Sequence, residues 1–371
     1  MTQSQIILLL CNLLLGYAAG FIMHRSDFCI AGMFRDLFLF RSTTMLKNLA
    51  LLILSSMVLF ELARRSGLLF IFPFPLLGNA SAVNLAGGLL FGVGMVLAGG
   101  CVVGTLYKVG GGSATSSMAL FGLLCGSYLY SEIHPWWSEL ARQTTFLPGR
   151  VTLPQALEMD PGIFVLVFAV AGGLWLLGEN RRAGLVRPAM IDNYLQPWKA
   201  ALLLSVIGLL SFAVVGMPLG ITTAYAKLGA YMVNALHPEH VARLSYFAGQ
   251  PLDYSIPYLH LVVKGGAGPQ VDGIALVQFP LIGGIILGAF SSAVLAKEFH
   301  IHIHVPFRQY ASALCGGLIM GLAARMAPAC NVWHLLGGMP VLGLQSMLFL
   351  IGLFPGAWLG TTILTRTVLT H

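Results

Sequence analysis

The chain has 371 residues, of which 57% are hydrophobic and only 9% are charged. Soluble proteins of this size carry roughly a quarter charged residues, so the composition excludes a soluble globular protein and indicates an integral membrane protein. The formal net charge of +7 comes from basic residues that lie mostly in short loops between apolar runs. Such residues set the orientation of membrane proteins. No helix-turn-helix, zinc-finger or basic-aromatic pattern is present, so nucleic acid is not expected as a partner.

Nine apolar runs are candidates for transmembrane helices, which need about 20 residues each. They lie near residues 5–23, 45–62, 83–99, 113–131, 161–178, 199–216, 274–296, 309–327 and 343–366. Further apolar segments, interrupted by glycine, proline or cysteine, lie at 24–44, 100–112, 217–232 and 328–342. These resemble re-entrant segments, which occur at membrane depth only where protein or a polar cavity covers their backbone. We therefore predict an all-α polytopic membrane protein, with 1–371 as a single membrane domain.

The loop residues indicate an orientation. If the N-terminus lies outside the cell, the loops after the odd-numbered spans face the cytoplasm, and they hold Arg25, Arg35, Arg41, Lys108, Arg181, Arg182, Arg187, Lys297 and Arg308. The positive-inside rule then favours a periplasmic N-terminus and a cytoplasmic C-terminus. Arg64 and Arg65 oppose this orientation.

One motif occurs twice. Gly-Gly-x3-Gly-x8-Cys begins at Gly87 and ends at Cys101, and it recurs from Gly316 to Cys330. Each copy follows a long apolar run, so the duplication predicts two related halves, 1–131 and 199–371. Residues 132–198 form a linker that includes the fifth span. Four spans plus one linking span turn the second half upside down, as in transporters built from inverted repeats.

Candidate substrate-binding residues lie at the breaks that end these runs. Gly100 and Gly104 let the backbone around Cys101 approach a ligand closely, and a helix start there favours an anion. Cys29 and Cys330 also lie at breaks. With no charge-compensating cation expected beside the buried Cys101 thiol, we expect it to stay protonated and to donate a weak hydrogen bond to a sulfur-containing anion.

The remaining cysteines and one further break complete the candidates. Cys11, Cys125 and Cys315 lie inside unbroken apolar runs, where a free cysteine usually packs as a small hydrophobic residue. The segment 220–224 occupies the position in the second half that Cys29 has in the first. This correspondence adds Thr222 to the candidate site.

No sequence pattern predicts a cofactor or a metal. Walker A, His-Glu-x-x-His and Gly-x-Ser-x-Gly motifs are absent from the sequence, so an ATPase, a zinc protease or a hydrolase is not supported. His300, His302 and His304 alternate, but no carboxylate is near to orient them. A basic cytoplasmic loop is favoured there over a metal site.

The segments around the three cysteines resemble the YeeE/YedE family of sulfur-transport membrane proteins. The matching segments are 25–36, 92–108, 220–223 and 329–331. The resemblance implies an hourglass-like inverted repeat of nine spans, with re-entrant segments that meet at its centre. It also implies that Cys29, Cys101 and Cys330 relay thiosulfate inward by hydrogen bonds, often with a TusA-like sulfurtransferase in the cytoplasm.

These observations together predict a bacterial inner-membrane importer, and not an enzyme, for thiosulfate or a related small sulfur oxyanion. Substrate would bind at the three break-point cysteines and at the backbone near Gly100, Gly104 and Thr222. Two alternatives stay open: a membrane-embedded sulfurtransferase that forms a cysteine persulfide, and a transporter of a selenium compound. A soft-metal transporter that uses Cys and Met ranks last, because no carboxylate or histidine lies near the cysteines in sequence.

Overall fold

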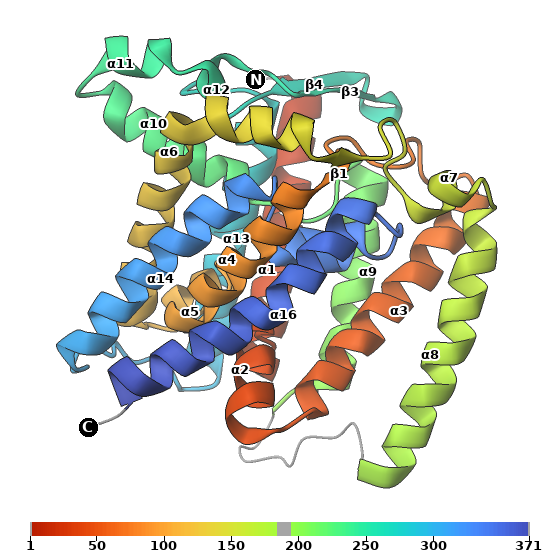
Figure 1. Ribbon diagram of the computed structural model, residues 1–371, viewed down its shortest axis with the longest axis horizontal. Helices are drawn as coiled ribbons and strands as arrows, with labels where there is room; N and C mark the ends of the chain where they lie inside the picture. The colour runs from red at the N-terminus through yellow and green to blue at the C-terminus, as the bar shows by residue number, and fades with distance from the viewer. Residues whose placement is uncertain (1, 184–193, 370–371) are drawn as a thin grey trace.

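A computed structural model describes residues 2–183 and 194–369. Arg187 and part of the predicted 132–198 linker lie outside the described residues. Figure 1 shows long helices running between two faces of the molecule, with the N-terminus at one face and the C-terminus at the other. We call these the N-face and the C-face. The long helices are α1 (Gln3–Ser26), α3 (Thr44–Arg65), α4 (Ala82–Leu97), α6 (Ala114–Gln143), α8 (Pro161–Ala183), α9 (Pro197–Val215), α13 (Gly273–Leu295), α14 (Phe307–Met326) and α16 (Leu344–Leu364).

Short helices begin at each predicted interruption of the chain. They are α2 (Ile30–Phe40), α5 (Val102–Gly110), α10 (Thr222–Asn234) and α15 (Asn331–Trp333), the last continued by the π-helical turn η2 (His334–Gly338). The residues that cap their N-termini are Cys29, Cys101, Ile221 and Cys330. The chain bends by 47° between α14 and the segment Asn331–Gly338. The three predicted cysteines therefore lie at the starts of helices.

The helices confirm an all-α polytopic membrane protein. Seven helical segments of the described chain are long and apolar enough to cross a membrane, or eight if the bent pair is one span. The predicted count of nine is not confirmed, because the predicted span 113–131 lies in α6, which is not among them. Buried Ser116, Ser127 and Ser131 contribute to the lower hydropathy of α6. The chain ends lie at opposite faces (Figure 1), which requires an odd number of crossings.

The duplicated glycines explain how the central helices pack. A Cβ atom on Gly88 of α4 would lie 2.2 Å from the backbone oxygen of Phe349 in α16. A Cβ atom on Gly317 of α14 would lie 2.1 Å from the backbone oxygen of Ala119 in α6. Small residues let helix backbones approach this closely in lipid, where packing rather than water exclusion drives association. The two copies of the motif thus make equivalent contacts.

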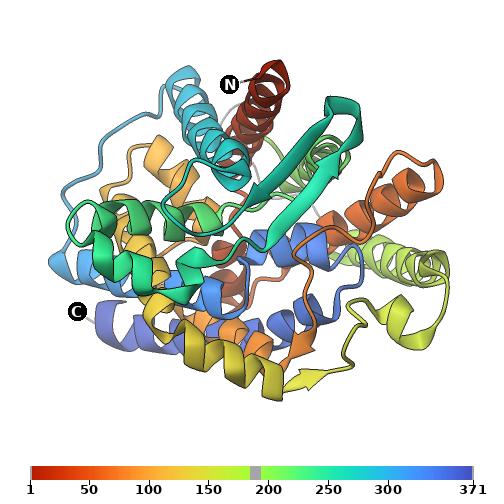
Figure 2. The ribbon, with the colours of Figure 1, turned by 90° about the horizontal axis from the view of Figure 1, so that it is seen from above.

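Small elements cover the N-face. Residues 235–272 form α11 (Pro238–Arg243), α12 (Ser245–Ala248) and an antiparallel hairpin of β3 (Leu252–Ile256) and β4 (Leu261–Gly265), joined by the 3-10 turn η1 (Pro257–Leu259). Figure 2 looks onto this face and shows the hairpin lying across it. Residues of β3 are alternately buried and exposed, so one side of the strand packs on the bundle. The other small elements are β1 (Ala80–Ser81), β2 (Thr145–Phe146), α7 (Leu153–Leu157) and the turn η3 (Thr365–Leu369).

Candidate functional site

The break before Cys101 is built by two glycines. Gly99 adopts a left-handed conformation with φ 70°, which suits glycine because it has no Cβ. Its N–H donates to the backbone oxygen of Val96, and the N–H of Gly100 donates to that of Met95. This pair of bonds is the Schellman arrangement that ends a helix. The chain then starts again as α5, with Cys101 as its N-cap.

Gly104 brings two thiols together. A Cβ atom at this position would lie 3.2 Å from the sulfur of Cys101 and 3.2 Å from the sulfur of Cys29. The side chains of Cys29 and Cys101 are close enough to act on each other. The Gly104 N–H donates to Cys101 Sγ over 3.3 Å. Cys29 and Cys101 come from breaks that are far apart in sequence, so the fold itself assembles this pair.

Cys330 lies near unpartnered polar groups. Tyr225 of α10 is buried, and its hydroxyl has no hydrogen-bond partner in the described part of the chain. This tyrosine is near enough to Cys330 and Cys101 for both to act on it electrostatically. Both side-chain polar atoms of Asn331 are also buried without a partner. Buried polar groups are rarely left unpaired unless a ligand or water completes them, so this region can take up a polar ligand.

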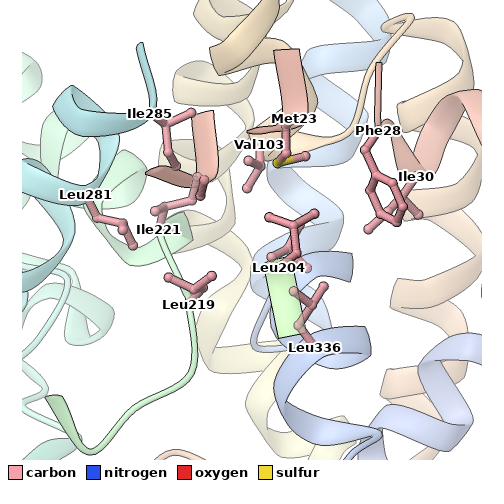
Figure 3. Close-up of a pocket in the computed structure, with 12 residues that line it drawn as sticks. Met23, Phe28, Ile30, Val103, Leu204, Leu219, Ile221, Leu281, Ile285 and Leu336 are labelled. Atoms are coloured by element: carbon pink, nitrogen blue, oxygen red, sulfur yellow. The ribbon is translucent and has the colours of Figure 1, made fainter. Parts of the chain in front are cut away.

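A small apolar cavity shows that the four breaks converge. Its volume is about 30 Å³, and its lining includes one residue from beside each break, namely Ile30, Val103, Ile221 and Val332. In Figure 3 the side chains of Ile30, Val103 and Ile221 surround this cavity together with other apolar residues. The lining has no polar surface. The cavity therefore marks where the breaks meet, but it cannot itself hold an anion.

An exposed residue precedes two of the cysteines. A larger cavity of about 490 Å³ lies at the N-face, and Arg325 and Pro328 are among its lining residues. Pro328 is exposed although it stands only two positions before Cys330. In the first half Gly99 is likewise exposed, two positions before Cys101. Between these points the three thiols are at most 4% exposed. The site is closed in this state.

The predicted glycine and threonine donors are engaged within the protein. The N–H of Gly100 is used in the helix end, and that of Gly104 is used by Cys101, so neither is free in this state. The hydroxyl of Thr222 accepts a hydrogen bond from Arg325. Thr222 is therefore held by Arg325, whereas Gly104 lies with the thiol pair.

Cations lie nearer to the thiols than the sequence indicated. Lys108 is near enough to act electrostatically on Cys29, and its ammonium group donates to the backbone oxygen of Gly99 over 2.6 Å. Arg325 is near enough to act on Cys330. A cation therefore accompanies Cys29 and another accompanies Cys330. Sequence distance hid the first contact, because Lys108 lies far along the chain from Cys29, almost two turns into α5.

Sequence reasoning missed Arg325, Tyr225 and His334. Arg325 lies inside the predicted span 309–327, and an ionisable residue within a span is a signal of function that we did not use. His334 is buried, and its ring nitrogens face the backbone oxygen of Ala327 and the hydroxyl of Ser346. It therefore fixes the break at Cys330 to α16.

The other predicted residues lie away from the breaks. Cys315 is exposed on α14, and Cys11 and Cys125 are half-buried. The rings of His300 and His302 are 6.3 Å apart. Within residues 2–183 and 194–369, no three His, Cys, Asp or Glu side chains are grouped as a metal site.

Comparison with known proteins extends these findings. The chain is 29% identical to the thiosulfate transporter TsuA of Spirochaeta thermophila, over 96% of this chain and 98% of that protein. It is 25% identical to TsuA of Escherichia coli, over 95% and 93% of the two chains. A probable transporter of E. coli, YedE, is 29% identical over 46% of this chain and 38% of its own length. Residues 25–359 match the model of the family described as sulphur transport, and the chain therefore belongs to this family of membrane proteins.

Proposed function

We propose that the chain imports thiosulfate, or a closely related sulfur oxyanion, by passing it along Cys330, Cys101 and Cys29. The observation that carries this proposal is the meeting of the Cys29 and Cys101 thiols over Gly104, in a region that water does not reach. Two relatives that align over nearly the whole chain are named thiosulfate transporters. The sulfur atom of a thiosulfate ion accepts hydrogen bonds from thiols weakly, and weak binding at several sites favours conduction.

The exposed positions at the two ends of the thiol region support a route through it. The N-face cavity reaches Pro328, and Gly99 is exposed before Cys101, so we propose that the anion enters at the first residue and leaves past the second. The three buried thiols would then form the closed part of the route between these two residues. The hydroxyl of Tyr225 and the amide of Asn331 are unpartnered there and would donate to the anion as it passes.

The proposed orientation places the N-face in the periplasm and the C-face in the cytoplasm, with the chain in the bacterial inner membrane. Arg64 and Arg65 at the N-face count against this orientation, although they form ion pairs with Glu61 and Asp160. The positive-inside rule counts Lys and Arg rather than net charge, so the proposal rests on the larger number of basic residues in the loops at the C-face.

The proposed halves, 1–131 and 199–371, are supported by matching contacts. Helix α4 packs on α16 through Gly88, and α14 packs on α6 through Gly317. In addition, Gly87 meets Ala327 at the end of α14, and Gly316 meets Ala98 at the end of α4. An inverted repeat relates each of these contacts to its counterpart.

A TusA-like sulfurtransferase at the C-face would accept the imported sulfur. This partner is part of the proposal because the family resemblance implies it. No observation favours a selenium compound or a cysteine persulfide. Mass spectrometry after exposure to thiosulfate tests the persulfide directly: a stable gain of one sulfur atom on Cys101 or Cys330 would establish covalent chemistry.

The import function is tested with two alanine variants. Cys101→Ala removes the central thiol and is expected to abolish uptake of labelled thiosulfate, with normal amounts of protein in the membrane. Cys315→Ala is the matched control, because this cysteine is exposed on α14 and far from the breaks in sequence. Uptake at the wild-type rate by Cys101→Ala would reject the relay.

A further inference from the structure

Arg325 is a buried charge without an opposite charge. Within residues 2–183 and 194–369, four Asp, Glu, Lys or Arg residues are buried: Lys47, Glu61, Lys227 and Arg325. Lys47 pairs with Glu179 at 2.6 Å, and Lys227 pairs with Asp272 at 2.9 Å. Glu61 pairs with Arg64 and Arg65. No carboxylate of the described chain lies within ion-pair distance of Arg325.

Neutral oxygens hold the Arg325 guanidinium in place. Its Nη1 donates to the hydroxyls of Thr223, at 3.0 Å, and Tyr246, at 3.2 Å. Its Nη2 donates to Thr222. The Nε atom is buried without any partner. Three acceptors leave two of the five N–H groups of a guanidinium unused. Burying a cation with neutral partners alone is costly, so this arrangement favours the arrival of an anion.

The cavity around Arg325 has the form of an anion vestibule. Its volume is about 490 Å³, and Tyr246 and Thr223 line it together with Arg325. Exposed Ser245 and Gln250 form its rim at the N-face. His134 also lines the cavity, and burial lowers its pKa, so this ring is neutral near pH 7. The guanidinium is therefore the positive charge of the cavity.

We propose that Arg325, with Thr223 and Tyr246, forms an entry site that captures divalent tetrahedral oxyanions before they reach Cys330. Guanidinium groups bind such anions through their oxygen atoms in a fixed fork geometry. The thiols, by contrast, act on the terminal sulfur. Selection then has two steps: the entry site selects for charge and oxygen, and the cysteines select for sulfur. The inference rests on the proposed import function for its place in transport.

Sulfate separates the two steps, because it has the oxygens of thiosulfate but lacks the terminal sulfur. Sulfate should occupy the entry site and compete with thiosulfate without being transported itself. In the wild-type protein, excess sulfate is expected to raise the thiosulfate concentration for half-maximal uptake. Equal ionic strength must be kept with chloride, since screening alone weakens anion binding.

Single substitutions of Arg325 test the entry site in transport. Arg325→Gln is expected to raise the thiosulfate concentration for half-maximal uptake about tenfold or more, and to abolish competition by sulfate. Arg325→Lys keeps the charge but loses the fork, and should give an intermediate value. Arg142→Gln, which removes an exposed arginine from the same face, is the matched control and should behave as wild type. The entry site would be refuted if Arg325→Gln kept the wild-type thiosulfate concentration for half-maximal uptake and sulfate still competed. If Arg142→Gln raised the thiosulfate concentration for half-maximal uptake equally, the effect would come from surface charge and not from the entry site.

Thermal unfolding of the purified protein tests the site without transport. A ligand that binds only the folded state raises the unfolding temperature. Sulfate should therefore stabilise the wild type relative to chloride at equal ionic strength, stabilise Arg325→Lys less, and leave Arg325→Gln unchanged. If Arg325 had only a structural role, sulfate would raise the unfolding temperature equally in the wild type and in Arg325→Lys. This comparison can be made even if Arg325→Gln fails to fold. Absence of thiosulfate uptake by the wild type would instead refute the import function, while the sulfate shift would still decide the entry site.

Discussion

Gly104 shows how a missing side chain can define a site. The sulfurs of Cys29 and Cys101 both lie where a Cβ atom on this residue would make tight contact, at 3.2 Å. Carbon atoms approach that closely only when a neighbour gives way. A larger residue would therefore move one thiol or both, and it would strain the hydrogen bond from the Gly104 N–H to Cys101 Sγ.

Gly104→Ala is accordingly expected to slow thiosulfate uptake about fivefold or more, the effect of losing roughly 1 kcal/mol of hydrogen bonding. The measurement is initial uptake into membrane vesicles at matched protein amounts. Gly173→Ala in α8 is the control, because a Cβ atom there meets nothing within 4 Å. If both variants transport at the wild-type rate, contact between the two thiols is unimportant.

Some residues of the site could be predicted from the sequence, and others could not. The break at Cys101 was predictable because glycines mark where a helix ends, and Gly99 adopts the left-handed conformation that they permit. The neighbours of Arg325 were not predictable. Thr222 precedes it by 103 positions and Tyr246 by 79, and no local pattern connects residues so far apart. Sequence therefore indicated the cysteines, and it held a signal for Arg325 as an ionisable residue within a span, while the partners of Arg325 required the fold.

Among the helices, α4 and α14 have the same function in packing. Each ends at a break before a cysteine, and each brings a glycine against the backbone of a neighbouring helix. The sequence motif predicted this relation, since Gly-Gly-x3-Gly places small residues along one side of a helix. The count of spans was less predictable because serines reduce the hydropathy of α6 below that of a typical membrane helix.

Gly88→Ala and Gly317→Ala test this equivalence. Each introduces a Cβ atom within 2.2 Å of a backbone oxygen, so each should force two helices apart at a cost of about 1–3 kcal/mol. Thermal unfolding in detergent should show a similar loss of stability for both. Gly283→Ala in α13, where nothing lies within 4 Å, should leave stability nearly unchanged. Destabilisation by only one of the two would contradict an equivalent role.

At the scale of the molecule, the chain ends lie on opposite faces (Figure 1), and the proposed orientation assigns each face to a compartment. Arg142→Cys and Arg308→Cys, each in a Cys315→Ala background, place a thiol at an exposed position on the N-face and the C-face. A membrane-impermeant thiol reagent should label Arg142→Cys in cells with only the outer membrane permeabilised. Arg308→Cys should react only after the inner membrane is opened. The reverse pattern would invert the topology.

The exposed positions Gly99 and Pro328 have an electrical consequence. If water enters the protein from both faces as far as these residues, the voltage across the membrane falls mainly over the short thiol layer between them. A dianion that moves inward through this layer works against an inside-negative voltage, at about 5 kcal/mol per 100 mV. Uptake into liposomes should therefore slow steeply as the interior is made more negative. In the cell, rapid removal of sulfur at the inner end would have to compensate for that opposing field.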